Sequence, residues 1–186
     1  MRFLLVSGST RSGSTNTAVL ATAAAVAPPD VEVGLYAGLS TLPAFNPDDE
    51  GAAPVDPAVG RLHAALAGAD AVVFCTPEYA GSLPGSFKNL LDWTVGGPQL
   101  QAMPVGWVNV ASIAAPTGGA GAHSELATVL GYVGAVRVEE ACRRAPMTRA
   151  AVTVDGTVDD AEVRGQLAAA LAGLRAAVLG RAARGE

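Results

Sequence analysis

The segment from residue 8 to residue 16 concentrates groups that bind anions. It lies between a short apolar run and an alanine-rich stretch, and it is built from small and hydroxyl-bearing residues. Such residues let the backbone curl so that several N–H groups point at one anion, and a helix N-terminus adds positive potential. The side chains that add donors or charge are Ser9, Arg11, Ser14, Thr15 and Asn16. We therefore expect a phosphate site, the alternative being an ordinary strand–helix turn capped by serine.

The glycine spacing in this segment narrows the kind of phosphate. Gly8 and Gly13 match the two glycines of the P-loop pattern GxxxxGK[ST], but Ser14 stands where that pattern has its lysine. The P-loop lysine is the group that reaches the β- and γ-phosphates. The glycines are also too far apart for the dinucleotide pattern GxGxxG. A loop with several hydroxyls and a single arginine, Arg11, suits a dianionic monophosphate better than a triphosphate.

A second candidate segment covers residues 76–85. Pro77 and Pro84 stiffen its ends, and Gly81 allows a close approach of the backbone. Tyr79 supplies a flat aromatic ring that could cover a planar ligand, whereas Glu78 has no neighbouring carboxylate with which to perform acid–base catalysis. The alternative is a rigid turn with an exposed tyrosine. Loops of this kind carry function more often than the elements that they connect.

Both segments follow short apolar runs that are typical of buried strands. We expect strands over residues 3–7, 31–35, 71–75, 104–111 and 135–138. We expect helices over residues 16–27, 57–67, 84–93, 122–132 and 159–179. This alternation predicts an α/β fold with a doubly wound parallel sheet. Ligands of such sheets bind beyond the carboxyl ends of the strands, so the loops after the first, third and fourth strands should form the site.

The composition excludes several classes of protein. The chain has 186 residues, of which half are hydrophobic and 16% are charged, and its formal net charge is −5. It is too apolar to be disordered and too acidic to be expected to bind duplex nucleic acid. Its apolar stretches are short or interrupted, so a membrane-spanning helix is not expected. Cys75 and Cys142 form no CxxC pattern. We expect one cytoplasmic domain over residues 1–186.

Two motifs point to a known family. The first is Gly8-Ser9-x-Arg11-x-x-Ser14-x-Asn16. The second reads Thr76-Pro77-Glu78-Tyr79-x-Gly81-Ser82-x-Pro84-Gly85-x-x-Lys88-Asn89-x-x-Asp92-Trp93, with weaker echoes at Leu42-Pro43-Ala44-Phe45 and Gly118-Gly119. Together they resemble the NADPH-dependent FMN reductase family, a flavodoxin-like group that includes quinone, chromate and azo-dye reductases. The resemblance covers essentially the whole chain and implies five strands in the order 2-1-3-4-5 with helices on both faces.

The resemblance also implies a set of FMN-binding residues. The phosphate loop corresponds to Ser9, Arg11, Ser14 and Asn16, with Thr15 between them. The segment along the isoalloxazine edge corresponds to Pro77, Glu78, Tyr79, Ala80 and Gly81. Ser112 and the turn formed by Pro116, Thr117, Gly118 and Gly119 correspond to the loop on the other side of the flavin. The family commonly has Asn where this chain has Ala80, which removes a side-chain amide expected near the flavin.

The activity implied by the resemblance is that of an FMN-dependent NAD(P)H oxidoreductase. Such an enzyme takes hydride from NADPH or NADH and passes electrons to a quinone, flavin, azo compound or similar small acceptor in a ping-pong cycle. Because FMN carries the chemistry, no catalytic side chain and no metal are expected. A homodimer or homotetramer is implied, with the 36–57 loop and the 84–93 helix at its interfaces. A flavodoxin-type electron shuttle and a non-catalytic nucleotide-binding module remain alternatives.

Overall fold

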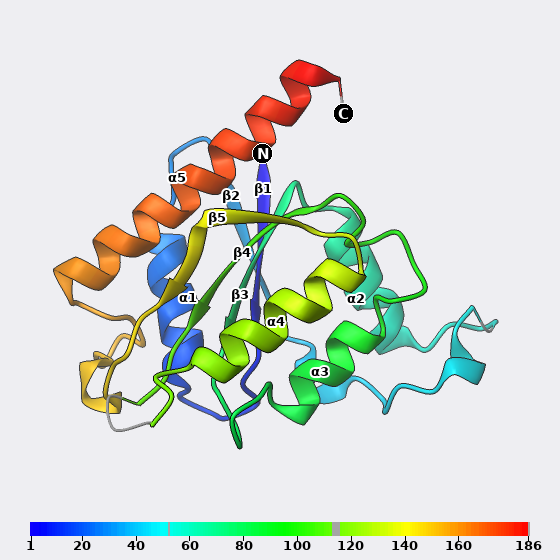
Figure 1. The fold of residues 1–186 in the computed structure, drawn as a ribbon, viewed down its shortest axis with the longest axis horizontal. Coiled ribbons are helices and arrows are strands. Elements are labelled where there is room, and N and C mark those ends of the chain that lie inside the picture. The colour runs from blue at the N-terminus through cyan, green and yellow to red at the C-terminus, as the bar shows by residue number, and fades with distance from the viewer. Residues whose placement is uncertain (52, 113–115, 186) are drawn as a thin grey trace.

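The computed structural model describes residues 1–51, 53–112 and 116–185, which contain a five-stranded parallel sheet (Figure 1). The strands are β1 (Arg2–Ser7), β2 (Glu32–Tyr36), β3 (Ala71–Thr76), β4 (Pro104–Asn109) and β5 (Val136–Arg144). Their order is β2-β1-β3-β4-β5, and every neighbouring pair is parallel. The predicted fold class and strand order are therefore confirmed.

Helices cover both faces of the sheet. They are α1 (Thr15–Ala25), α2 (Pro57–Ala67), α3 (Gly85–Asp92), α4 (Ala120–Tyr132) and α5 (Ala161–Arg184). α1 and α5 pack on one face, and α2, α3 and α4 pack on the other (Figure 1). Short 3₁₀ turns occupy Leu39–Thr41, Pro47–Asp49 and Arg149–Ala151.

The apolar excess of the composition is used by two separate cores. Along β1, Phe3 and Leu5 belong to the core under α1 and α5, whereas Leu4 and Val6 belong to the core under α2, α3 and α4. This alternation follows from the two-residue repeat of a strand. Strands buried on both faces read as continuous apolar runs, as β3 and β4 do. Among the described helices, none is both long enough and apolar enough to cross a membrane.

The last strand differs most from the sequence prediction. We expected a strand over residues 135–138, but β5 continues to Arg144. Its second half carries Glu139, Glu140, Arg143 and Arg144, which do not fit the apolar pattern of a buried strand. β5 lies at the edge of the sheet, and edge strands commonly carry charged residues that prevent pairing with other chains.

The strand order also fixes where a ligand can bind. β1 lies between β2 and β3. The connection from β1 leads to β2 on one side of it, whereas the chain that leaves β3 continues to β4 on the other side. The loops that follow β1, β3 and β4 therefore meet at one edge of the sheet. This edge is the switch point at which doubly wound sheets bind their ligands.

Candidate functional site

A cavity of about 440 Å³ opens at the carboxyl ends of the central strands. Its walls come from the loops after β1, β3 and β4 and from the segment that follows β5. The lining residues are Ser9, Arg11, Ser14, Thr15, Asn16, Pro77, Glu78, Tyr79, Val110, Ala111, Ser112, Met147, Thr148 and Arg149. The volume falls in the range typical of small-molecule sites. The structure thus brings together nine of the residues that the sequence singled out.

The first wall is the loop between β1 and α1. Ser14 caps α1, and its hydroxyl accepts the backbone N–H of Asn16 at 3.2 Å. The Asn16 side chain is buried and accepts the Cys75 thiol at 3.4 Å, which fixes the loop against β3. α1 has no acidic residue in its first turn. The positive end of its dipole is therefore not neutralised by a carboxylate within its own first turn.

Arg149 adds a second positive charge that sequence reasoning missed. A Cβ atom on Gly13 would lie 3.8 Å from Nη2 of Arg149, so this guanidinium lies beside the first loop. Within the described residues, neither Arg11 nor Arg149 forms a salt bridge. Only the strand order could have indicated Arg149, because the residues after β5 reach the same edge of the sheet only if β5 lies next to β4. The loop and these two arginines together match the charge of a phosphate dianion.

Tyr79 stands at the rim of the cavity in a tight turn. Its backbone exchanges two 3.0 Å hydrogen bonds with Ser82, and the two residues between them have positive φ, 52° for Ala80 and 79° for Gly81. Turns with two central residues of positive φ favour Asn-Gly. An asparagine at position 80, as the resemblance implies, would therefore favour this turn. Ala80 and Gly81 lie at the tip of this turn and do not line the cavity.

Glu78 connects this turn to the start of α4. One carboxylate oxygen accepts the Thr117 hydroxyl, and the other accepts the backbone N–H of Ala122 at 3.0 Å. The bond from Thr117, followed by backbone bonds from α4, holds the pKa of Glu78 below its usual range. A Cβ on Gly121 would lie 1.9 Å from the carbonyl oxygen of Gly81, so only glycine permits this approach.

The described part of the 116–119 turn adjoins the first cavity without appearing in its lining. Thr117 donates its hydroxyl hydrogen bond to Glu78, which lines the cavity, and Gly118 lines a neighbouring cavity. Gly119 precedes α4 with a φ of 83°. Ser112 does line the first cavity. The interpretation of this turn as a flavin contact stays a prediction.

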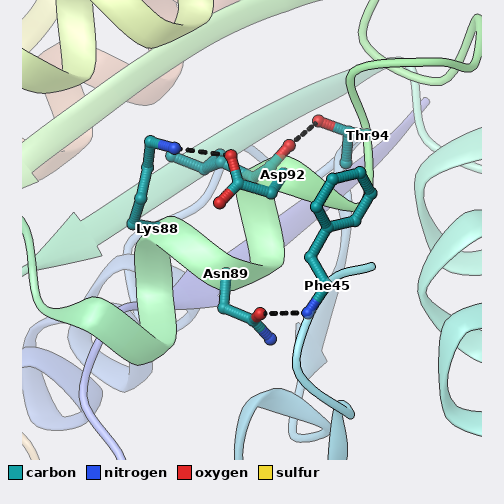
Figure 2. Close-up of polar contacts among 6 residues, drawn as sticks. Phe45, Lys88, Asn89, Asp92 and Thr94 are labelled. Atoms are coloured by element: carbon teal, nitrogen blue, oxygen red, sulfur yellow. Dashed lines mark hydrogen bonds and ion pairs between the residues drawn. The ribbon is translucent and has the colours of Figure 1, made fainter. Parts of the chain in front are cut away.

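The last part of the second motif lies on α3 and binds the chain itself, as Figure 2 shows. Oδ1 of Asn89 accepts the backbone N–H of Phe45 at 2.7 Å, and Nδ2 donates to the carbonyl of Pro43 at 2.8 Å. Nε1 of Trp93 donates to the same carbonyl at 3.0 Å. Lys88 and Asp92 form a 2.5 Å ion pair one turn apart. We call Pro43, Phe45, Asn89 and Trp93 the α3 clamp.

The two histidines lie outside the cavity lining. Nε2 of His63 is 2.7 Å from the carbonyl oxygen of Trp93, and Nδ1 of His123 accepts Nε1–H of Trp107 at 3.0 Å. Within the described parts of the chain, no group of three or more His, Cys, Asp or Glu side chains could hold a metal ion. The cavity instead offers backbone and hydroxyl donors, two guanidinium groups and an aromatic ring.

Comparison with known proteins gives this geometry a context. An NAD(P)H-dependent FMN reductase of Pseudomonas aeruginosa is 40% identical over 99 residues, which are 53% of this chain and 52% of that protein. A quinone reductase of Escherichia coli is 36% identical over 86 residues, 46% of each chain. The matched segments thus span about half the length of these relatives.

Solved structures match over a longer range. The flavoenzyme NAD(P)H:(acceptor) oxidoreductase FerB of Paracoccus denitrificans superimposes with a TM-score of 0.74 at 26% identity, covering 94% of this chain and 97% of that chain. A WrbA-like flavodoxin of Agrobacterium tumefaciens, at 19% identity, has a TM-score of 0.59 over 97% of each chain and shares the fold. The family model for NADPH-dependent FMN reductase matches residues 1–146. The chain therefore belongs to the NADPH-dependent FMN reductase family.

Proposed function

We propose that this protein binds FMN in the cavity at the switch point and passes electrons from NAD(P)H to a small acceptor such as a quinone. The observation that carries the proposal is the phosphate-sized cluster of donors formed by the first loop, Arg11 and Arg149. The named activities of the P. aeruginosa, E. coli and P. denitrificans relatives support the same reaction class.

The residues present fit FMN in both charge and shape. The N-terminus of α1, the loop hydroxyls and two unpaired guanidinium groups suit a phosphomonoester dianion. Tyr79 is 54% exposed at the rim, where its ring can lie against a planar group. When bound, FMN supplies the acceptance and release of hydride. The chain then has to position the flavin and admit the substrates, and it need not provide a nucleophile.

We further propose that donor and acceptor use the same opening in turn. Tyr79 is exposed at the rim of the cavity, and the walls come from the loops after β1, β3 and β4 and from the segment after β5. Two substrates that need the same face of one planar group must alternate, which is the structural basis of a ping-pong cycle. Competition between NADPH and a benzoquinone in steady-state kinetics tests this proposal, since parallel double-reciprocal lines are expected and intersecting lines contradict it.

The cofactor is tested by the visible spectrum and by titration with FMN. The purified protein is expected to quench FMN fluorescence with one site per chain. Arg11→Ala should weaken FMN binding about tenfold or more, because a hydrogen bond to a charged group contributes about 1.5–3 kcal/mol. Arg61→Ala, an exposed arginine on α2, is the matched control. Equal affinity in both variants would contradict the assigned role of Arg11.

The reaction is tested by adding NADPH without oxygen. Bleaching of the bound flavin, followed by recovery on addition of a benzoquinone, is the expected result. Flavin that binds but does not bleach with NADPH or NADH supports the electron-shuttle alternative. Protein that takes up no FMN supports the nucleotide-binding module and contradicts both redox functions.

We also propose that residues 1–186 form one FMN-binding domain that assembles as a homo-oligomer in the cytoplasm. Val55 and Val95 are more than half exposed. Val55 lines two surface pockets together with Trp93, and Val95 follows Trp93 by two positions in the chain. Exposed apolar side chains grouped in this way are typical of protein interfaces. Sedimentation of the wild-type protein and of Val95→Glu tests this, with dissociation expected in the variant. A monomeric wild type would contradict the proposed assembly.

A further inference from the structure

A second cavity, of about 510 Å³, lies beside the first at the same edge of the sheet. It is lined by Gly118, His123, Cys142, Arg143, Arg144 and Pro146. Pro146 lines this cavity whereas the next residue, Met147, lines the first one. Likewise Gly118 follows Thr117, which binds the Glu78 carboxylate of the first cavity. Consecutive residues, Pro146 and Met147, therefore line the two cavities, which places them side by side.

An irregularity in β5 directs the two arginines into this place. Val105 pairs with Arg137 and Trp107 pairs with Cys142, so β5 carries three more residues than β4 across this step. Gly106 permits the bulge, since a Cβ there would lie 2.4 Å from the Cβ of Ala141. Bulges of this kind re-aim side chains next to functional sites. Here the pairing resumes so that Arg143 and Arg144 lie at the carboxyl end of the strand, opposite Val108 and Asn109.

His123 is held at the same cavity as a neutral hydrogen-bond donor. Nε1–H of Trp107 donates to its Nδ1 at 3.0 Å, and Oδ1 of the buried Asn109 lies 2.9 Å from the same nitrogen. A ring that accepts at Nδ1 carries its proton on Nε2. Burial, followed by the charges of Arg144 and Arg137, lowers the pKa of His123, with Glu139 opposing them. A neutral ring that accepts from Trp107 at Nδ1 has Nε2–H as its remaining donor, at the cavity that His123 lines.

In the part of the chain that the structure describes, no carboxylate forms a salt bridge with either arginine of this cavity. Arg137 pairs with Glu139, but within the described residues neither Arg143 nor Arg144 forms a salt bridge. Nη1 of Arg143 donates a hydrogen bond to the carbonyl oxygen of the neighbouring Cys142 at 3.4 Å. Two adjacent unpaired guanidinium groups in a chain of net charge −5 form a local anion site.

We propose that Arg143, Arg144 and His123 bind the 2′-phosphate of the nicotinamide nucleotide and thereby select NADPH over NADH. This inference rests on the proposed function, because the nicotinamide ring must reach the flavin in the first cavity. The flavin phosphate has its own pair of arginines, Arg11 and Arg149. The second cavity therefore serves a different anion. Two guanidinium groups and a neutral donor match a phosphomonoester dianion better than the singly charged groups of a pyrophosphate.

Adenosine 2′,5′-bisphosphate tests the site independently of catalysis. Calorimetric titration of the FMN-loaded protein should show binding of this probe, with adenosine 5′-monophosphate as the control ligand. Arg144→Gln and Arg143→Gln should each weaken binding of the bisphosphate about tenfold or more. Arg61→Gln should not. Both arginines of the cavity are at least partly exposed, so neither change should unfold the protein, and an unaltered FMN spectrum verifies this.

The kinetic readout separates the 2′-phosphate from the pyrophosphate. In Arg144→Gln, the KM for NADPH should rise about tenfold while the KM for NADH stays unchanged. Equal increases for both nucleotides, or no increase for either, would overturn the assignment. A protein that oxidises neither nucleotide contradicts the proposed function, but binding of the bisphosphate and its loss in Arg144→Gln would still support the site.

Discussion

The α3 clamp and the first cavity use polar side chains in opposite ways. In the clamp, Asn89 and Trp93 direct three hydrogen bonds at the backbone of residues 43 and 45, so the chain satisfies its own donors and acceptors. At the cavity, the Arg11 and Arg149 guanidinium groups have no salt-bridge partner within the described residues. Polar residues of this chain therefore either stabilise the fold or remain available to a ligand. Their hydrogen-bond and ion-pair partners show which of the two roles each residue has.

This difference predicts that clamp substitutions change stability and leave FMN binding intact. Trp93→Ala should lower the free energy of unfolding by about 3–5 kcal/mol, the usual cost of removing a large buried aromatic side chain. Trp93 is only 5% exposed and its ring meets Phe45 edge-on at 5.0 Å. Trp93→Phe keeps a ring but loses the bond to Pro43, so about 1 kcal/mol is expected. Denaturant unfolding of both apoproteins measures the effect.

A folded Trp93→Phe protein that binds FMN much more weakly than the wild type would contradict the separation between the α3 clamp and the cavity. In that case the clamp would shape the cavity as well as the fold. An unchanged FMN affinity with reduced stability keeps the two regions distinct.

Arg149→Ala should have the opposite pattern. We expect FMN affinity to fall by about 1.5–3 kcal/mol, because the phosphate loses a charge-assisted hydrogen bond. The unfolding free energy of the apoprotein should change by less than about 0.5 kcal/mol, as for most exposed substitutions. Fluorescence titration with FMN and denaturant unfolding give the two numbers, with Arg61→Ala as control. A destabilised apoprotein with normal FMN affinity would make Arg149 part of the fold.

Arg11 and Arg149 also show which parts of the site can be predicted from the sequence. Arg11 was identified because it lies within nine consecutive residues whose types and position after a strand indicate a phosphate loop. Arg149 comes to the same place because β5 lies beside β4 and continues to Arg144, and the charged residues of its second half do not have the apolar pattern of a buried strand. The doubly wound fold, in contrast, was readable from the alternation of apolar runs and helical stretches.

The contacts of the α3 clamp could not be predicted from the sequence for a related reason. Asn89 and Phe45 are 44 positions apart, and nothing in either residue type indicates that they meet. The sequence could show that Lys88, Asn89, Asp92 and Trp93 belong to a motif, but not that the motif binds residues 43 and 45. Local chemistry is therefore predictable from spacing, whereas a bond between distant loops requires the packing to be known.

Glu78 combines both roles, since it lines the cavity and also ties the turn after β3 to the start of α4. Glu78→Gln should lower the unfolding free energy at neutral pH by about 1 kcal/mol, the contribution of its charged hydrogen bonds reduced for partial solvent exposure. Because the pKa of Glu78 is lowered in the folded protein, this contribution is complete above the ordinary pKa of a glutamate. It is lost as the pH falls through the lower folded pKa.

Unfolding measured from neutral to acidic pH checks this behaviour. The stability difference between wild type and Glu78→Gln should shrink toward zero at low pH. Glu125→Gln, an exposed residue on α4, should show no such change. A difference that is independent of pH would show that the carboxylate charge of Glu78 is not what joins the loops.

The smallest effect is expected at Ala80, where the turn at the cavity rim can be improved without touching the cavity. Ala80 has a φ of 52°, a conformation that costs a residue with a Cβ about 1–2 kcal/mol and that asparagine tolerates better. Ala80→Asn should therefore raise the unfolding free energy by about 0.5–1 kcal/mol, while Ala150→Asn, at an exposed position outside the left-handed region, should not. FMN affinity should stay within about twofold, because Ala80 does not line the cavity. Tighter FMN binding without added stability would instead show that the amide acts on the flavin, and that this turn belongs with the ligand-binding region rather than with the framework.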